Sequence, residues 1–260
     1  MLMKWGVTGD EKRLYINTAI GCDSGCSYCY LKLLGINDVK ERFMASKLIE
    51  VAEKEYKFVP GAKGTIISLG CYSECWDTEN RVETLKVIKY FLQHGNYIQM
   101  ATKQEVLYSD IHEIKEYIKF RDQFFLYISL PTINESKRIE PFACNVEKRI
   151  KSFELKWRLP ICMVLYIKPV LEGVTIRDKE KYMKLIKKYE VPVVVGEYLK
   201  PNQEGNITVG RTKMVGYEGD EEGFLRKEFE AVTDVYSLNS RAKFITTHSY
   251  SPFFFKARCL

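Results

Sequence analysis

The segment INTAIGCDSGCSYCYLKLLG, residues 16–35, places three cysteines within eight residues, at Cys22, Cys26 and Cys29. It begins inside the run RLYINTA, residues 13–19, whose apolar and β-branched content predicts a β-strand. The cysteines are therefore expected in the loop that follows the first strand. In α/β proteins, the loops at the carboxyl ends of parallel strands carry the chemistry. The segment thus indicates both a fold class and the place of a site.

A rhythm of strand followed by helix continues through the first 200 residues. Six such units with strongly apolar strands predict an α/β fold: a parallel sheet covered by helices, closer to a partial (β/α)6 TIM-type barrel than to a full eightfold one. The expected strands are 13–19, 64–70, 96–102, 124–130, 160–167 and 191–199. Two helices are expected over 44–58 and 145–156. A third has an inner face of Val82, Leu85, Ile88, Phe91 and Leu92, and a fourth carries Ile111, Ile114 and Ile118 and is capped by Ser109 or Asp110. A fifth begins near Asp178, with Tyr182, Leu185, Ile186 and Tyr189 facing inward.

The rhythm breaks after residue 200, which predicts a core of residues 1–200 and a C-terminal extension of residues 201–260 packed on it. Within the extension we expect a glycine-punctuated hairpin over 205–219, a helix over 220–236 and an aromatic, basic tail.

Composition restricts the class of protein. The chain has 260 residues, 46% of them hydrophobic, and a formal charge of +6, which permits contact with a polyanion without requiring it. No apolar run is long enough to span a membrane and the N-terminus lacks a signal-peptide pattern, so we expect a cytoplasmic protein with no membrane partner. In such a reducing compartment, the eight cysteines are expected to be ligands, redox groups or buried residues.

The number of thiols in the first loop favours an iron–sulfur cluster over zinc. A tetrahedral zinc site needs a fourth ligand, which this spacing does not supply. Three thiolates can hold three corners of a 4Fe-4S cube and leave one iron open to chelate a substrate or cofactor.

The pattern Cys-x3-Cys-x-aromatic-Cys, in the loop after the first strand of a partial barrel, resembles the signature of the radical S-adenosylmethionine enzymes. The resemblance implies that Cys22, Cys26 and Cys29 bind the cluster. It also implies that S-adenosyl-L-methionine binds the open iron, and that an electron from a flavodoxin- or ferredoxin-type donor cleaves it to a 5′-deoxyadenosyl radical. Tyr28 would then lie near the adenine.

A second resemblance covers residues 13–199 and concerns the spore photoproduct lyases, which repair a thymine dimer in DNA. The matching stretches are CDSGCSYCYLKLLG, SLGCYSECWD (68–77), ATKQ (101–104), YISL (127–130) and RIEPFACNVEKRI (138–150). The resemblance implies that Ser73, Glu74, Lys103 and Ser129 hold the amino, carboxylate and ribose groups of S-adenosylmethionine. A lysine and a carboxylate suit a ligand that carries both charges.

The lyase resemblance also implies catalytic roles. Cys71 would return a hydrogen atom to the product radical, with Cys75 as a competitor for this role, and Tyr30 and Tyr28 would relay the resulting thiyl radical. In that family a late hairpin grips the DNA lesion, a part that residues 205–217 with Arg211 and Lys213 are placed to play, unless they form a plain surface hairpin.

Two alternatives stay open at the level of sequence. Known lyases of this family have an additional N-terminal region with no counterpart in this sequence. That difference and the modest net charge favour a radical enzyme that acts on a small molecule or a peptide instead. A non-catalytic iron–sulfur or zinc module would use the three cysteines alone and would give no role to Lys103 or Ser129.

Overall fold

A computed structural model describes residues 6–32, 34–171, 173–195, 198–201, 207–208 and 244–246. Its main sheet has eight strands in the order β1-β2-β5-β6-β7-β8-β10-β13. These strands are β1 Val7–Gly9, β2 Arg13–Ile16, β5 Ile66–Leu69, β6 Ile98–Thr102, β7 Phe124–Ser129, β8 Cys162–Ile167, β10 Val193–Val195 and β13 Phe244–Thr246. All neighbours pair in parallel except β1, which is antiparallel to β2.

This topology confirms the α/β fold expected from the sequence. The six predicted strands correspond to β2, β5, β6, β7, β8 and β10, and they lie side by side in chain order. Within the described residues the sheet has two ends and does not close on itself, as expected for a partial barrel. The sequence did not indicate β13, which pairs with β10 and extends the sheet by a further parallel strand.

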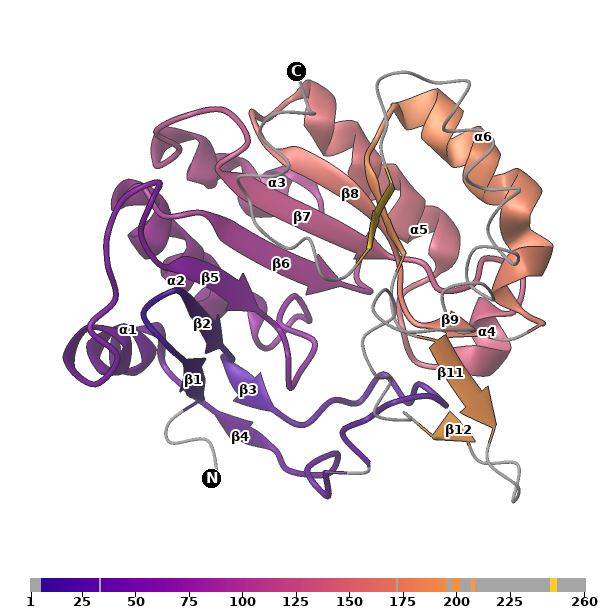
Figure 1. Ribbon diagram of the computed structural model, residues 1–260, viewed down its shortest axis with the longest axis horizontal. Coiled ribbons are helices and arrows are strands. Elements are labelled where there is room, and N and C mark those ends of the chain that lie inside the picture. Colours follow the sequence, from indigo (N-terminus) through magenta and orange to yellow (C-terminus); the bar gives the residue numbers. More distant parts are fainter. Residues whose placement is uncertain are drawn as a thin grey trace.

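The helices lie along the outside of the sheet, with α1 and α2 beside its first strands and α5 and α6 beside its last (Figure 1). They are α1 Ala45–Lys54, α2 Arg81–Gln93, α3 Tyr108–Ile111 with the 3-10 turn η1 His112–Glu116, α4 Ser136–Ile139, α5 Val146–Lys151 with η2 Ser152–Trp157, η3 Thr175–Asp178 and α6 Lys179–Tyr189. The predicted inner faces of α2 and α6 are largely confirmed, because Ile88, Phe91, Tyr182 and Tyr189 are buried.

Two details of the predicted helices are wrong. Val82 is 61% exposed, because it lies in the first turn of α2, outside the stripe that faces the sheet. Ser109 and Asp110 do not cap α3: Leu107 precedes the helix, and no side chain there accepts a capping hydrogen bond. Asp110 pairs instead with Arg81 of α2, so its carboxylate ties two helices together.

Short strands outside the main sheet form two small sheets of their own. The expected strand 13–19 ends early, and β3 Ala19–Ile20 pairs with β4 Glu41–Arg42 on either side of the cysteine loop. The expected strand 191–199 is likewise divided, because β11 Tyr198–Pro201 joins β9 Val170–Leu171 and β12 Ile207–Thr208 in a separate sheet. The rest of the predicted hairpin with Arg211 and Lys213, and the predicted helix 220–236, lie outside the described residues.

In the part of the chain that the structure describes, none of the helices has the length and apolar character needed to cross a membrane.

The two faces of β7 show how the sheet separates core from site. Phe124, Leu126 and Ile128 pack with the helices in the main core, whereas Phe125 and Tyr127 belong to a second cluster on the opposite, inner face. All six residues of the strand are buried, as expected of a central parallel strand covered on both sides.

Gly21, where the cysteine loop leaves β3, is the most restrictive glycine for the site. Its φ is +96°, and a Cβ built there would lie 1.6 Å from the carbonyl oxygen of Val39. Its backbone N–H donates to the carbonyl oxygen of Tyr72 at 2.9 Å, which joins the loop to the end of β5.

We expect Gly21→Ala to lower the free energy of unfolding by about 2 kcal/mol or more, because strain at a positive φ adds to a backbone collision. Gly35→Ala is the matched control: its φ is also positive, at +66°, but a Cβ there meets nothing within 4 Å. It should lose only about 1 kcal/mol. Urea unfolding followed by circular dichroism measures both, and equal losses would contradict the steric account.

Candidate functional site

A cavity of about 830 Å³ lies at the carboxyl ends of β2, β5, β6, β7 and β8. It is lined by ten of the residues that the sequence singled out: Cys22, Cys26, Cys29, Tyr28, Tyr30, Cys71, Ser73, Glu74, Lys103 and Ser129. These residues come from four separate strand ends, and the parallel register brings them to one place. Cys75, the competitor of Cys71, does not line the cavity and is 1% exposed.

The cysteine loop forms one wall of the cavity and is held from two sides. Cys29 N–H donates to the Cys26 carbonyl oxygen at 3.1 Å, which closes a turn between the two cysteines. Ser27 N–H donates to the Ile139 carbonyl oxygen at 2.9 Å, a contact with the segment that follows β7. The thiol of Cys22 donates to Ser24 Oγ at 3.3 Å, and Cys26 is 5% exposed.

Glu74 joins the ends of β5 and β6. Its Oε1 accepts from Thr102 Oγ1 at 2.6 Å and from Trp76 N–H at 3.1 Å, and its Oε2 accepts from Lys103 N–H at 2.8 Å. Burial raises the pKa of Glu74, and the hydrogen bonds with Thr102 and Lys103 oppose that shift. The carboxylate therefore orders the backbone beside the cavity in addition to facing it.

Lys103 places a cation at the centre of the site. Its Nζ lies 5.7 Å from the centre of the Tyr28 ring. Burial alone lowers the pKa of Lys103, but the neighbouring Cys26, Glu140 and Glu74 outweigh burial and raise it. The side chain is thus a permanent positive charge beside the cysteine loop.

Two buried hydroxyls point to a ligand. Ser73 Oγ and Ser129 Oγ are buried, line the cavity, and have no hydrogen-bond partner among the described residues. Buried polar atoms in proteins are nearly always paired, so these two are available to a polar molecule bound in the cavity.

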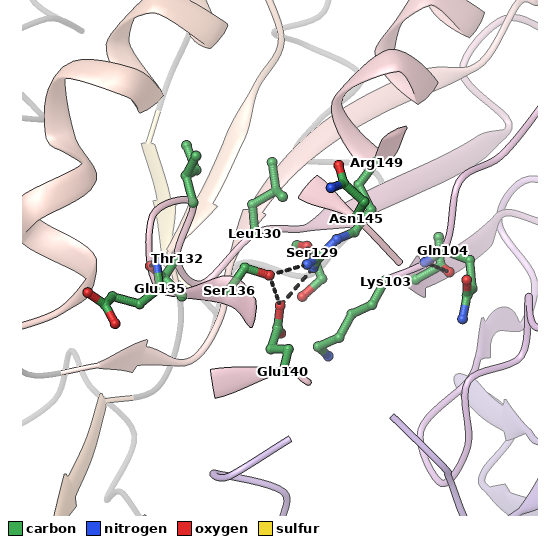
Figure 2. Close-up of polar contacts among 12 residues, drawn as sticks. Lys103, Gln104, Ser129, Leu130, Thr132, Glu135, Ser136, Glu140, Asn145 and Arg149 are labelled. Carbon is green, nitrogen blue, oxygen red and sulfur yellow. Dashed lines mark hydrogen bonds and ion pairs between the residues drawn. The ribbon is translucent and has the colours of Figure 1, made fainter. Parts of the chain in front are cut away.

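The structure adds a buried network around Glu140 and Arg149, two residues of the matching stretch RIEPFACNVEKRI to which the sequence assigned no role. Arg149 on α5 donates from Nη1 to Glu140 Oε2 at 2.8 Å and to the Ser129 carbonyl oxygen at 2.9 Å, and from Nη2 to Ser136 Oγ at 2.6 Å. Figure 2 shows these contacts, with Lys103 extending toward Glu140. The hydroxyl of Tyr28 donates to Glu140 Oε1.

Cys71 faces the cavity at the end of β5. Burial raises the pKa of its thiol to about 11, against the opposing charges of Lys168 and Arg13. Tyr30 donates from its hydroxyl to the carbonyl oxygen of Cys71, so the two residues that the sequence linked in one reaction are in contact. The thiol of Cys71 is protonated at neutral pH.

Below these residues, part of the inner face of the sheet carries a row of polar groups. Ser68 Oγ donates to Gln99 Oε1 at 3.3 Å, and Gln99 Nε2 donates to Tyr127 Oη at 3.3 Å. The rings of Tyr127 and Tyr166 meet edge to face, with centroids 5.4 Å apart. None of these three side chains was predicted as a site residue, although the alternation of residues along each strand is enough to assign them to one face.

No family model and no curated protein matches the chain. Solved structures do. One spore photoproduct lyase variant matches with a TM-score of 0.66 at 16% identity, over 90% of this chain and 76% of the lyase chain. A second variant, with bound AdoMet and dinucleoside spore photoproduct, matches with a TM-score of 0.65 at 13% identity, over 89% of this chain and 75% of the lyase chain. Streptococcus suis SuiB bound to S-adenosylmethionine matches with a TM-score of 0.62 at 13% identity, over 94% of this chain and 54% of SuiB.

At these identities the likeness is one of fold. The chain shares the α/β architecture of the lyase and of SuiB, and it spans about half the length of the SuiB structures.

The raised pKa of Cys71 predicts an unusual alkylation profile. In the folded protein, the iodoacetamide rate at Cys71 should still rise about tenfold per pH unit between pH 9 and 10, because only the thiolate reacts. In the urea-unfolded chain, the same rate should level off near the ordinary pKa of 9.0. Peptide-resolved mass spectrometry measures both. A folded-state profile that levels off near 9 would show that burial does not protect this thiol.

Proposed function

We propose that the protein is a radical S-adenosylmethionine enzyme whose Cys22, Cys26 and Cys29 bind a 4Fe-4S cluster. The observation that carries the proposal is a convergence: the cysteine loop lines the same cavity as the buried hydroxyls of Ser73 and Ser129, which have no hydrogen-bond partner among the residues that the structure describes. A thiolate site beside a polar cradle is what a cluster with one open iron and a chelating cofactor needs.

The thiols suit a cluster better than a single ion. Within the described ranges, no three His, Cys, Asp or Glu side chains are grouped closely enough to hold one metal ion. In a cube, each thiolate binds a different iron, so three thiols need not converge on one point. A tetrahedral zinc site would need a fourth ligand, which the spacing of the loop does not supply.

The residues around the cavity suit S-adenosylmethionine. Lys103 supplies a cation for the carboxylate of the methionine end. Glu74 accepts three hydrogen bonds from the described residues, which leaves one of its four acceptor positions for the ammonium group. Ser73 and Ser129 supply hydroxyls for the ribose or the ammonium group. Tyr28 presents a ring for the adenine.

With cluster and cofactor bound, the site would supply a carbon radical that abstracts hydrogen from a substrate carbon. Cys71 is proposed to complete the reaction: its S–H bond breaks homolytically, the hydrogen atom passes to the product radical, and a thiyl radical remains on sulfur for Tyr30 or Tyr28 to relay. The protonated state of Cys71 and its place in the cavity, which Cys75 does not share, support this role.

The substrate we propose is a thymine dimer in DNA, split by a carbon–carbon lyase reaction of the spore photoproduct lyase type. The bound dinucleoside photoproduct in a structure of similar fold supports it, as does Cys71. We place the enzyme in the cytoplasm, with a flavodoxin- or ferredoxin-type protein as electron donor.

A peptide is the second candidate substrate, because SuiB has a similar TM-score of 0.62 and was solved with its precursor peptide SuiA. A small-molecule substrate stays open with it. The polar layer of Ser68, Gln99 and Tyr127 gives any of these substrates hydrogen-bonding groups below the cofactor site.

Cys26→Ala should abolish cluster binding, because two thiolates rarely hold a cube. After anaerobic reconstitution and reduction, its bound iron and its 5′-deoxyadenosine formation should fall to background. Cys144→Ala is the control, since Cys144 does not line the cavity, and it should retain both. A reconstituted wild-type protein that binds iron but does not cleave S-adenosylmethionine would overturn the proposed function.

Cys71→Ala separates the lyase from its alternatives. With the dinucleoside spore photoproduct, the wild type should restore thymine, and the variant should do so more than about tenfold less while its deoxyadenosine formation changes less than about twofold. Cys75→Ala should behave as wild type in the hydrogen-transfer step. Deoxyadenosine formation without thymine restoration by the wild type would favour the peptide or small-molecule substrate.

A further inference from the structure

The ion pair between Glu140 and Arg149 has the properties of a positioning device. Both side chains are 0% exposed, and the pair is closed at 2.8 Å. A buried ion pair adds little net stability compared with an apolar pair of the same volume, because desolvation offsets the attraction. The role of this ion pair is therefore indicated by the groups that its two side chains contact.

Their contacts lead to two sides of the proposed cofactor site. From Glu140, the path goes to the hydroxyl of Tyr28 in the cysteine loop. Arg149 donates to the carbonyl oxygen of Ser129 at the end of β7. The hydroxyl of Ser129 is buried in the cavity and has no partner within the described part of the chain. A planar guanidinium with several donors in fixed directions is suited to hold such groups at set positions.

The backbone around Glu140 also lies against the loop. Ile139 accepts from Ser27 N–H at 2.9 Å, and Phe142 N–H donates to the Ser24 carbonyl oxygen at 3.3 Å. The fit is close, since a Cβ at Gly25 would lie 2.6 Å from the Phe142 ring. The segment 139–142 thus clamps the loop between the first and the third cysteine.

We propose that Glu140 and Arg149 are positioning residues that hold the cysteine loop, through Tyr28, in register with the end of β7. The pair acts on the cofactor only through Tyr28 and Ser129. That the cofactor is S-adenosylmethionine rests on the proposed function, whereas the hold on the loop does not.

Glutamine at position 140 tests the proposal sharply. Glu140 uses one oxygen for Tyr28 and the other for Arg149 and Ser136. Glutamine is uncharged and has a single acceptor oxygen, so Glu140→Gln removes the charge that strengthens both contacts and can keep Tyr28 only through a neutral hydrogen bond from its amide. Tyr28→Phe removes the hydrogen bond of the loop to Glu140 and leaves the ion pair with Arg149 intact.

The first readout is thiol labelling of the full chain before reconstitution. Cys26, buried in the loop, and Cys75, buried at the end of β5, are compared in one experiment. In Glu140→Gln and Tyr28→Phe, we expect Cys26 to be labelled about tenfold faster, as the loss of a charge-assisted hydrogen bond permits, with the Cys75 rate unchanged. The control is Arg138→Gln, which removes an exposed pair with Glu135 on the same short helix.

Equal acceleration at both cysteines would show that the pair serves general stability, and unchanged rates at both would show that it does not hold the loop. Either result overturns the proposal. If Glu140→Gln does not fold, Tyr28→Phe and Arg149→Lys carry the same comparison.

The second readout is the dissociation constant of S-adenosylmethionine for the reconstituted protein. Glu140→Gln and Tyr28→Phe should each raise this dissociation constant about tenfold. The double variant should have a dissociation constant no higher than that of the more weakly binding single variant, because both substitutions act through one contact. Additive losses would overturn the proposed path. If the variants show the expected faster labelling of Cys26 but the reconstituted wild type binds no S-adenosylmethionine, the proposed function is refuted and the role of the pair in holding the loop stands.

Discussion

Parallel pairing of the central strands is the constraint on which the site depends. Because β2, β5, β6, β7 and β8 run in one direction, their carboxyl ends meet at a single edge of the sheet. A cysteine loop, a thiol, a lysine and two hydroxyls that are up to about a hundred residues apart in the chain thereby share one cavity. Shifting one strand by a residue would exchange its inner and outer faces and disperse the set.

The same strands supply stability on one face and chemistry on the other. On the outer face, side chains such as Leu14, Leu126 and Ile128 are fully buried under the helices. On the inner face, Ser68, Gln99 and Tyr127 form a hydrogen-bonded row, where a closed barrel would carry branched apolar side chains. The inner face thus combines an apolar cluster that includes Phe125 and Val164 with a polar row that lines the cavity.

Hydrophobic periodicity was sufficient to predict the six central strands and the outer helices, because burial on the sheet imposes it directly. Motif positions were sufficient for the cavity residues, since each lies at a strand end. Other features depend on contacts between distant residues. β13 is short and follows a long segment with no strand–helix rhythm, and the Glu140 contact with Tyr28 spans 112 positions. The stretch RIEPFACNVEKRI resembled the lyase pattern, but the sequence does not give the partners of Glu140 and Arg149, and neither residue was assigned a role.

Charge balance explains why the buried pair and Lys103 belong together. Lys103 lies among Cys26, Glu140 and Glu74, all of which favour its charged form. Without Arg149, the carboxylate of Glu140 would form an ion pair with the ammonium group of Lys103. Arg149 neutralises Glu140 at 2.8 Å, and Glu74 is held by Thr102 and by backbone N–H groups. Because its neighbours are already satisfied, Lys103 keeps its attraction for an anionic group that enters the cavity, as the carboxylate of an amino-acid cofactor would.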